Sequence, residues 1–218
     1  MRLGAGRATD LSPDGRWAVT VAIADPSAIT LLPIGAGEAR RLTHPGIVQY
    51  EWARLLPDGE SVVFGGGQRD RNLRVWIGDL RGGRPRPITP EGFAARSALV
   101  AGPARLVIAG CPPLKLCAYP FDGGEARPLD GLSDSVALSV DGSGTGLLLR
   151  PRGRRFPVLV ERLDLRTSER TSWAEVSPPD PVGAGPLAGL IQSGDGRSFA
   201  YDFERRLSEL YLVAGLTR

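Results

Sequence analysis

The sequence predicts an all-β protein: a β-propeller of about five four-stranded antiparallel blades, forming a single domain over residues 1–218. Three observations predict this fold class. The composition is rich in turn-forming residues, an Asp-Gly turn recurs along the chain, and a Gly-Gly turn recurs between its copies. Repeats of about 40–45 residues are typical of propeller blades.

The composition favours short strands and tight turns. The 218 residues include 29 glycines and 19 prolines, whereas aromatic residues make up only 6%. The hydrophobic fraction of 42% is sufficient for a packed core, which excludes wholesale disorder. Such a composition argues against a helical protein.

The first repeat is an Asp-Gly turn that leads into a strand. Its copies centre on Asp14-Gly15, Asp58-Gly59, a worn unit near Pro103-Ala104, Asp141-Gly142 and Asp195-Gly196. The intervals are about 44, 45, 38 and 54 residues, close to the length of a four-stranded blade. Asp-Gly supplies the positive φ angles that a tight hairpin turn requires.

The second repeat is a Gly-Gly type of turn that lies between these copies. It occurs at residues 34–43, 80–89 and 121–129, with a weaker copy at 165–170. Each unit therefore begins with an Asp-Gly turn, which leads into a strand such as residues 17–23 and then into a third strand such as residues 73–77. The Gly-Gly type of turn follows, and a short fourth strand ends the unit. No such unit can bury both faces alone, so neighbouring units must stack.

The two chain ends raise the question of closure. Residues 203–210 could form one helical turn, but strand, loop and strand is preferred because Tyr211–Val213 sits where a third strand belongs. Arg2-Leu3 aligns with the fourth-strand residues Arg41-Leu42, so the N-terminal segment could complete the last blade and close a five-bladed ring. An open arc of a larger propeller, and Met1 as a truncation point, stay open as alternatives.

Neither the net charge nor the two cysteines indicate a nucleic-acid partner or a bound metal. The net charge is +3, and the basic run Arg150–Arg155 is interpreted as a solvated hairpin tip rather than a phosphate or nucleic-acid contact. Cys111 and Cys117 cannot make a closed metal site with a histidine as remote as His44. Two packed thiols are the preferred interpretation, and a cross-strand disulfide stays open.

No residue pattern demands an enzyme. His44 is the only candidate general base, and Ser143 and Ser193 lack the nucleophile-elbow pattern. Gly65–Gly67 and Gly142–Gly146 lack the lysine of a phosphate-binding loop. The sequence predicts no catalytic, cofactor-binding or metal-binding residue and no cofactor.

Two sets of recurring residues have a structural explanation. The aspartates recur at the same turn of separate blades, so they cannot form a calcium cage; they are Asp14, Asp58, Asp141 and Asp195. The tryptophans are expected to pack between blades rather than to form a ligand cage; they are Trp17, Trp52, Trp76 and Trp173.

The repeated turn resembles that of the bacterial WD40-like family, in which blades carry Ser-Pro-Asp-Gly, as in TolB-like propellers and the propellers of prolyl oligopeptidases. The resemblance covers nearly the whole chain through four clear units and one worn unit. Residues 195–201 and 206–216 are similar to the end of the C-terminal propeller of bacterial eukaryotic-like serine/threonine kinases. In that family the propeller is a sensor or interaction module, usually separated from the kinase by a membrane segment. No kinase motif is present here.

The resemblance implies a non-catalytic interaction or sensor module of a kinase-linked signalling protein, which binds a protein, a peptide or a small ligand. The alternative is an accessory gating propeller of a prolyl-oligopeptidase-type peptidase, or a propeller enzyme with a site in its channel. A degenerate fragment without an independent role is a third interpretation. No membrane segment or signal peptide is expected in this chain. It would act in the cytoplasm as written, or outside it as part of a membrane-anchored kinase.

Overall fold

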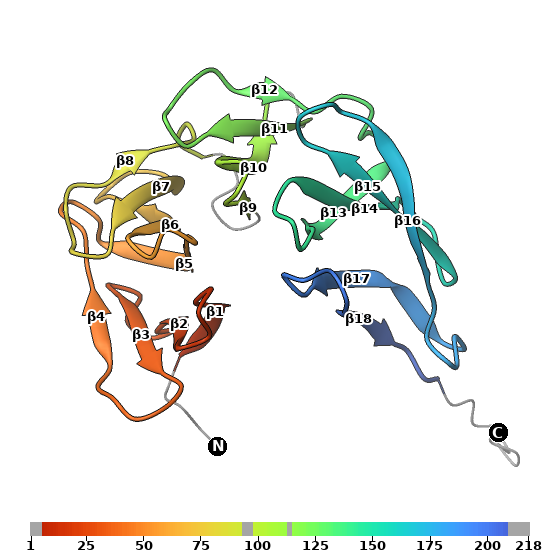
Figure 1. Cartoon of the computed structure of the whole chain (residues 1–218), viewed down its shortest axis with the longest axis horizontal. Helices are drawn as coiled ribbons and strands as arrows, with labels where there is room; N and C mark the ends of the chain where they lie inside the picture. Colours follow the sequence, from red (N-terminus) through yellow and green to blue (C-terminus); the bar gives the residue numbers. More distant parts are fainter. Residues whose placement is uncertain (1–5, 93–97, 113–114, 209–218) are drawn as a thin grey trace, which may run out of the picture. The chain divides into compact units, whose positions relative to one another are not determined.

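The computed structural model describes residues 6–92, 98–112 and 115–208 (Figure 1). These residues form eighteen strands in five antiparallel sheets and contain no helix. The chain divides into two compact units, Met1–Ser133 and Asp134–Arg218. The all-β prediction is therefore confirmed. Within the described residues, no helix that could cross a membrane is found.

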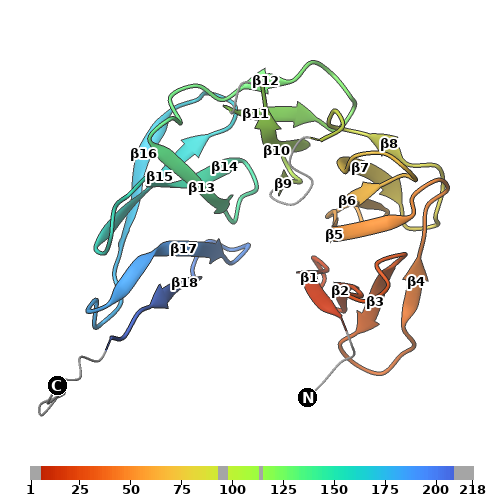
Figure 2. The same cartoon turned by 180° about the vertical axis from the view of Figure 1, so that it is seen from behind.

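The first unit holds three four-stranded sheets, and in each the strand order follows the sequence (Figures 1 and 2). The first comprises β1 (Arg7–Leu11), β2 (Trp17–Val21), β3 (Ile29–Pro33) and β4 (Arg40–Leu42). The second comprises β5 (Gln49–Leu55), β6 (Ser61–Gly67), β7 (Arg74–Asp79) and β8 (Arg86–Pro87). The third comprises β9 (Leu99–Ala101), β10 (Leu106–Cys111), β11 (Lys115–Pro120) and β12 (Arg127–Pro128).

The second unit holds one four-stranded sheet and one two-stranded sheet. The former comprises β13 (Ser135–Val140), β14 (Gly146–Pro151), β15 (Val158–Asp164) and β16 (Arg170–Val176). The latter comprises β17 (Ala184–Gln192) and β18 (Phe199–Arg205). Four complete blades are thus present, and the fifth has two strands among the described residues, which corrects the expectation of about five four-stranded blades. Tyr211–Val213 and Arg2-Leu3, expected as its third and fourth strands, lie outside the described residues.

The repeated turn joins the first and second strands of every sheet. In each copy an amide donates to the carbonyl three residues earlier: Gly15 to Ser12, Gly59 to Leu56, Arg105 to Gly102, Gly144 to Asp141 and Gly196 to Ser193. The donating residue has positive φ in all five turns, between 54° and 72°. The sequence alignment was wrong in two of them, because Gly144 rather than Gly142 and Arg105 rather than Ala104 occupy this position.

The strand ends explain this shift in the fourth turn. Asp141 N donates to Gly146 O at 2.9 Å, just as Ser12 N donates to Trp17 O at 2.8 Å. Asp141 is therefore the counterpart of Ser12, not of Asp14. The Asp-Gly dipeptide marks the turn in the sequence, but the backbone pairing sets its register.

Apolar side chains fill the spaces between neighbouring sheets within each unit. One buried cluster joins the first and second sheets and includes Val19, Phe64 and Trp76, with Trp17 packed against it. A second cluster joins the second and third sheets, with Trp52 at its edge. In the second unit, a cluster between the fourth sheet and β17 and β18 has Trp173 packed against it. The predicted packing role of the tryptophans is confirmed.

Side chains also link the first two sheets through their first strands. Thr9 Oγ1 donates to Ala53 O at 2.9 Å, and Leu55 N donates to the Asp10 carboxylate at 3.2 Å. Arg54 completes this link through an ion pair with Asp10 at 3.4 Å. These bonds satisfy backbone groups on the edge of β5, which no strand covers within the described residues.

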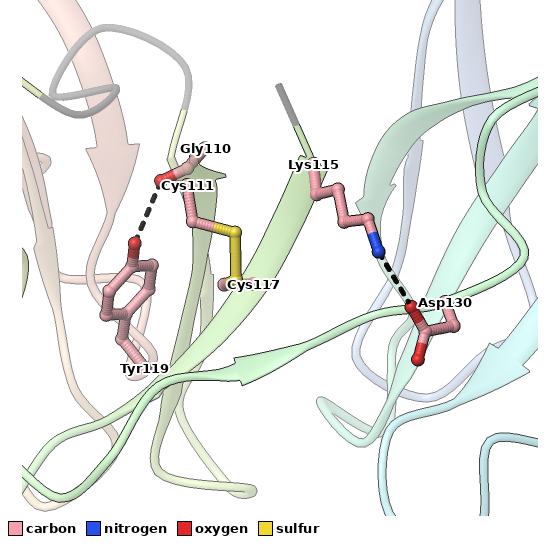
Figure 3. Close-up of a disulfide and its surroundings, with 6 residues drawn as sticks. All are labelled: Gly110, Cys111, Lys115, Cys117, Tyr119 and Asp130. Carbon is pink, nitrogen blue, oxygen red and sulfur yellow. Dashed lines mark hydrogen bonds and ion pairs between the residues drawn. A yellow bond between two sulfur atoms is a disulfide. The ribbon is translucent and has the colours of Figure 1, made fainter. Parts of the chain in front are cut away.

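Cys111 and Cys117 form a disulfide across the β10–β11 hairpin (Figure 3). Their Cα atoms lie 5.9 Å apart, within the range that a disulfide spans. The preference for two packed thiols was therefore wrong. The sequence could not decide this because the turn between the strands sets the register, which places Cys117 opposite Ala109 and Cys111 opposite Lys115.

Candidate functional site

His44 lies in the connection between β4 and β5, and its side chain is buried. Its Nδ1 lies 3.1 Å from the hydroxyl of Tyr50, and its Nε2 lies 3.1 Å from the carbonyl of Asp79. Because a carbonyl only accepts, Nε2 carries the proton and Nδ1 accepts from the Tyr50 hydroxyl. The ring stacks on Phe64 at 4.7 Å between centroids. Both ring nitrogens therefore anchor the β4–β5 connection to the second blade.

Burial shifts the pKa values of both His44 and Tyr50. It lowers the pKa of His44 below its ordinary value, although the carbonyl and the charge of Asp79 oppose the shift. Burial also raises the pKa of Tyr50 to about 12. Both groups are therefore neutral at physiological pH.

The serines and aspartates of the repeated turns bond within their own turns. Ser193 Oγ donates to Asp195 Oδ1 at 2.6 Å, and Ser143 Oγ donates to Asp141 Oδ1 at 2.8 Å. In the part of the chain that the structure describes, no group of three or more acidic, histidine or cysteine residues could hold a metal. The glycine run Gly65–Gly67 lies within strand β6 rather than in a loop.

A polar cavity of about 530 Å³ lies at one end of the second blade and is the candidate functional site. Strands β5 and β7 begin at this end, and strand β6 ends there. Its lining comes from the β4–β5 connection, the first residue of β5, the β6–β7 connection and the segment after β8: Val48, Gln49, Gln68, Arg69, Asp70, Arg71, Asn72 and Glu91.

Backbone hydrogen bonds fix the rim of this cavity. Val48 N donates to Gly67 O at 2.9 Å, and Arg71 N donates to Gln68 O at 3.3 Å. Arg71 is clamped by an ion pair with Glu91 at 2.9 Å. The loop between β6 and β7 is therefore held at both ends while its tip stays accessible.

The tip of the β6–β7 loop carries opposite charges on neighbouring residues. Arg69 and Asp70 are exposed, and Asp70 has a left-handed backbone with φ of 57°. The amides of Gln68 and Asn72 add both donors and acceptors, and Val48 is 47% exposed. This set can recognise a polar chain that carries both donors and acceptors, but its lining contains no nucleophilic serine, cysteine or histidine.

Sequence reasoning missed this cavity. Its one signal is the polar run Gln68–Asn72 between two strands, which reads equally well as an ordinary loop. The other lining residues include Gln49, at the start of β5, and Glu91, after β8, and only the folded sheet brings them together with this run.

A second cavity, of about 360 Å³, lies between the turns of the second unit. Its polar groups already bond one another. Gln192 Oε1 accepts from Gly142 N at 2.8 Å, and Gln192 Nε2 donates to Gly196 O at 3.1 Å. A Cβ on Gly142 would lie 2.1 Å from Ser193 O, so the two turns are in tight contact. We therefore interpret this cavity as part of the packing contact between the β13–β14 turn and the β17–β18 turn.

The basic run Arg150–Arg155 includes the end of β14 and the connection to β15. Arg152, Arg154 and Arg155 are exposed, as expected of a solvated hairpin tip. Arg152 N donates to Asp134 O at 2.6 Å, which anchors the base of the loop.

Comparison with known proteins identifies the fold. No protein-family model matches the chain. No curated protein matches it either. Oligogalacturonate lyase of Vibrio parahaemolyticus matches with a TM-score of 0.63 and 13% identity, over 89% of this chain and 58% of that one. TolB of Acinetobacter baumannii matches with a TM-score of 0.61 and 18% identity, over 88% and 47%.

Puromycin hydrolase is a third similar structure, with a TM-score of 0.53 and 16% identity, over 89% of this chain and 35% of that one. The chain has a TolB-like β-propeller fold. It spans about half the length of TolB and of the lyase. At such identities the likeness shows the fold alone, and neighbours with different activities share it.

Proposed function

We propose that this chain is a non-catalytic interaction module that binds an extended peptide segment of a partner protein in the polar cavity of the second blade. The observation that carries the proposal is the lining of that cavity. It combines two guanidinium groups, two carboxylates, three amides and the exposed side chain of Val48. A peptide offers the same mixture of backbone donors, acceptors and side chains of either charge.

Loop geometry supports this role. The cavity lies mainly on connections, and the strands of the second sheet are packed on both sides by buried apolar clusters. Because Arg71 is held by Glu91, the exposed Arg69 is the cation that is positioned to meet a carboxylate of the ligand.

Selection of peptides from a random library on the immobilised chain tests this function. Titration calorimetry then compares the selected peptide on the wild type, on Arg69→Ala and on Asn72→Ala, with Arg166→Ala as an exposed arginine control outside the cavity. We expect both cavity variants to bind at least about tenfold more weakly, or about 1.4 kcal/mol, and the control to bind as the wild type does. Equal binding by all four proteins would exclude the cavity as the site.

The proposal extends to signalling on the strength of the sequence resemblance to kinase-linked propellers. In that setting the module senses a ligand outside the membrane and the kinase lies elsewhere in the parent protein. The Cys111–Cys117 disulfide supports this location, because disulfides persist in oxidising compartments and are rare in the cytosol.

A second candidate function is supported by the structural neighbours. The propeller fold is shared with puromycin hydrolase and oligogalacturonate lyase, so an accessory propeller of a peptidase or a propeller enzyme is the alternative. Co-expression with the protein encoded by the adjacent gene distinguishes the two: a hydrolase that gains activity or selectivity in the complex favours the alternative.

A further inference from the structure

The tip of the β6–β7 loop is a turn with two charged residues at its centre. Arg71 N donates to Gln68 O at 3.3 Å and closes the turn, so Arg69 and Asp70 are its two central residues. Both are exposed. Asp70 has a φ of 57°, in the left-handed region that Asp and Asn enter more readily than most other residues. The backbone therefore presents a guanidinium and a carboxylate on consecutive residues of the cavity lining.

The carboxylate of Asp70 differs from those of other turn aspartates. In other turns of the chain an aspartate accepts a hydrogen bond from the backbone amide two residues later, as Asp79 does from Arg81 N at 2.7 Å. The same bond is found at Asp14, Asp25, Asp58, Asp122, Asp164, Asp180 and Asp195. Within residues 6–92, 98–112 and 115–208, Asp70 makes no such bond. Its side chain is therefore not used to stabilise its own turn.

Arg69 also has no partner in the part of the chain that the structure describes. Its guanidinium forms no ion pair and no hydrogen bond there, and it does not pair with the neighbouring Asp70. The next arginine behaves differently, because Arg71 Nη1 lies 2.9 Å from Glu91 Oε1. The four charges of the lining therefore comprise one closed ion pair and two open charges of opposite sign.

Amide groups around these charges are also open to a ligand. Gln49 Nε2 donates to Glu51 Oε1 at 2.7 Å, which leaves Gln49 Oε1 as an acceptor. The side chains of Gln68 and Asn72 form no hydrogen bond with another described residue. These amides can bond the backbone of an extended peptide while the two charges contact its side chains.

The two open charges favour a ligand that carries both signs. A peptide with charges of a single sign would meet one favourable and one unfavourable partner, whereas a peptide with an acid and a base would satisfy both. In an extended peptide, side chains two residues apart lie on the same face, about 7 Å from each other. An acidic and a basic residue with this spacing can reach Arg69 and Asp70 together.

We infer that the ligand segment carries an acidic and a basic residue two positions apart, the acid for Arg69 and the base for Asp70. The inference rests on the proposed function, since it specifies the peptide that the same cavity binds. It makes the order of the charges, rather than the net charge, the feature that the cavity recognises.

Three capped heptapeptide libraries test this order on the full chain. Their central residues are Glu-Ala-Lys, Lys-Ala-Glu or Gln-Ala-Gln, and the outer positions are randomised identically. The tightest binder of each library is measured by fluorescence anisotropy at low and at high salt. We expect one charged order to bind at least about tenfold more tightly at low salt than the other order and the neutral peptide. The margin should narrow at high salt, because salt screens exposed ion pairs.

Neutral variants show which charges the peptide contacts. Arg69→Gln and Asp70→Asn should each reduce the preference between the two orders, and the double variant should abolish it. Asparagine is tolerated in the left-handed region, so we expect the turn to be retained. Arg81→Gln is the control and should keep the preference, since Arg81 is exposed and follows the opposite end of β7.

Two results would overturn the inference alone. One is equal affinity of the three peptides when Asn72→Ala weakens them all, since the cavity would then bind peptides without selecting their charges. The other is a preference that persists in the double variant. Absence of binding by every library would overturn the proposed function and the inference with it.

Discussion

Asp141 Oδ2 accepts a hydrogen bond from Arg162 Nε at 2.6 Å, although the aspartate side chain is only 6% exposed. The other carboxylate oxygen accepts from Ser143 Oγ at 2.8 Å and from Gly146 N at 3.1 Å. A Cβ at Gly146 would lie 2.4 Å from Oδ2, so glycine leaves the space that the ion pair occupies. The pair joins the repeated turn to strand β15.

The Asp141–Arg162 ion pair predicts that the folded state loses stability in acid. Burial would raise the pKa of Asp141, but the hydrogen bonds from Ser143 and Arg162 outweigh it and hold the pKa below the ordinary 3.8. The stabilising contribution is therefore present above pH 3.8 and is lost as the pH falls through the lowered pKa of the folded state. Asp141→Asn should lower the free energy of unfolding by about 1–3 kcal/mol at pH 7, and the loss should shrink below pH 3.8.

Urea unfolding at several pH values measures this loss. Asp14→Asn is the matched control for burial, because Asp14 lies in the same type of turn and accepts a hydrogen bond from Ser12, but is exposed. A constant difference between wild type and Asp141→Asn across the acid range would contradict the prediction.

His44 predicts a second pH dependence, near neutrality. Its pKa is lowered in the folded state by burial, so the unfolded chain binds a proton more readily below pH 6.5. Stability should be full above pH 6.5 and should decrease as the pH falls below it. His44→Ala should cost about 1–3 kcal/mol at pH 7, because Tyr50 loses its partner, and should flatten the profile between pH 7 and 5.

Thermal unfolding across that pH range checks this prediction. Because the chain has no other histidine, no second histidine contributes to the pH dependence. Binding of the selected peptide at pH 7 should be the same in wild type and His44→Ala under conditions where both are folded. A catalytic or ligand-binding role for His44 would instead appear as a loss of function without a loss of stability.

Gly59 predicts a purely conformational effect. Its φ is 69°, and a Cβ there would meet nothing within 4 Å. Gly59→Val should therefore destabilise the chain by about 1–3 kcal/mol through backbone strain alone. Gly35→Val is the control, since Gly35 has the same open space without positive φ. Equal melting temperatures for the two variants would argue against the turn geometry.

The disulfide predicts sensitivity to reduction. Cys111 and Cys117 are six residues apart, and closing so short a loop stabilises the folded state by about 2 kcal/mol in the chain-entropy model. Dithiothreitol should lower the unfolding midpoint of the wild type and leave that of the double variant Cys111→Ala/Cys117→Ala unchanged. Alkylation of both cysteines in the unreduced, unfolded chain would show that the bond is absent.

Much of the fold could be predicted from the sequence because its signals are local. Asp58-Gly59 and its copies specify turns through backbone conformation, and the alternation of apolar residues in segments such as 17–23 specifies strands. The candidate site could not be predicted in this way. Gln49 begins strand β5, Arg69 lies in the β6–β7 connection and Glu91 follows β8, and no spacing in the sequence relates them.

The sequence by itself determined that one β unit is repeated and that a turn joins the strands of each copy, because turn chemistry acts over a few neighbouring residues. Only the tertiary structure decided that Asp141 takes the place of Ser12 in its turn, that Cys111 and Cys117 are bonded, and that His44 anchors the β4–β5 connection to the second blade. These features depend on strand register and on contacts between sheets, where residues distant in the chain compete for the same hydrogen bonds and the same buried space.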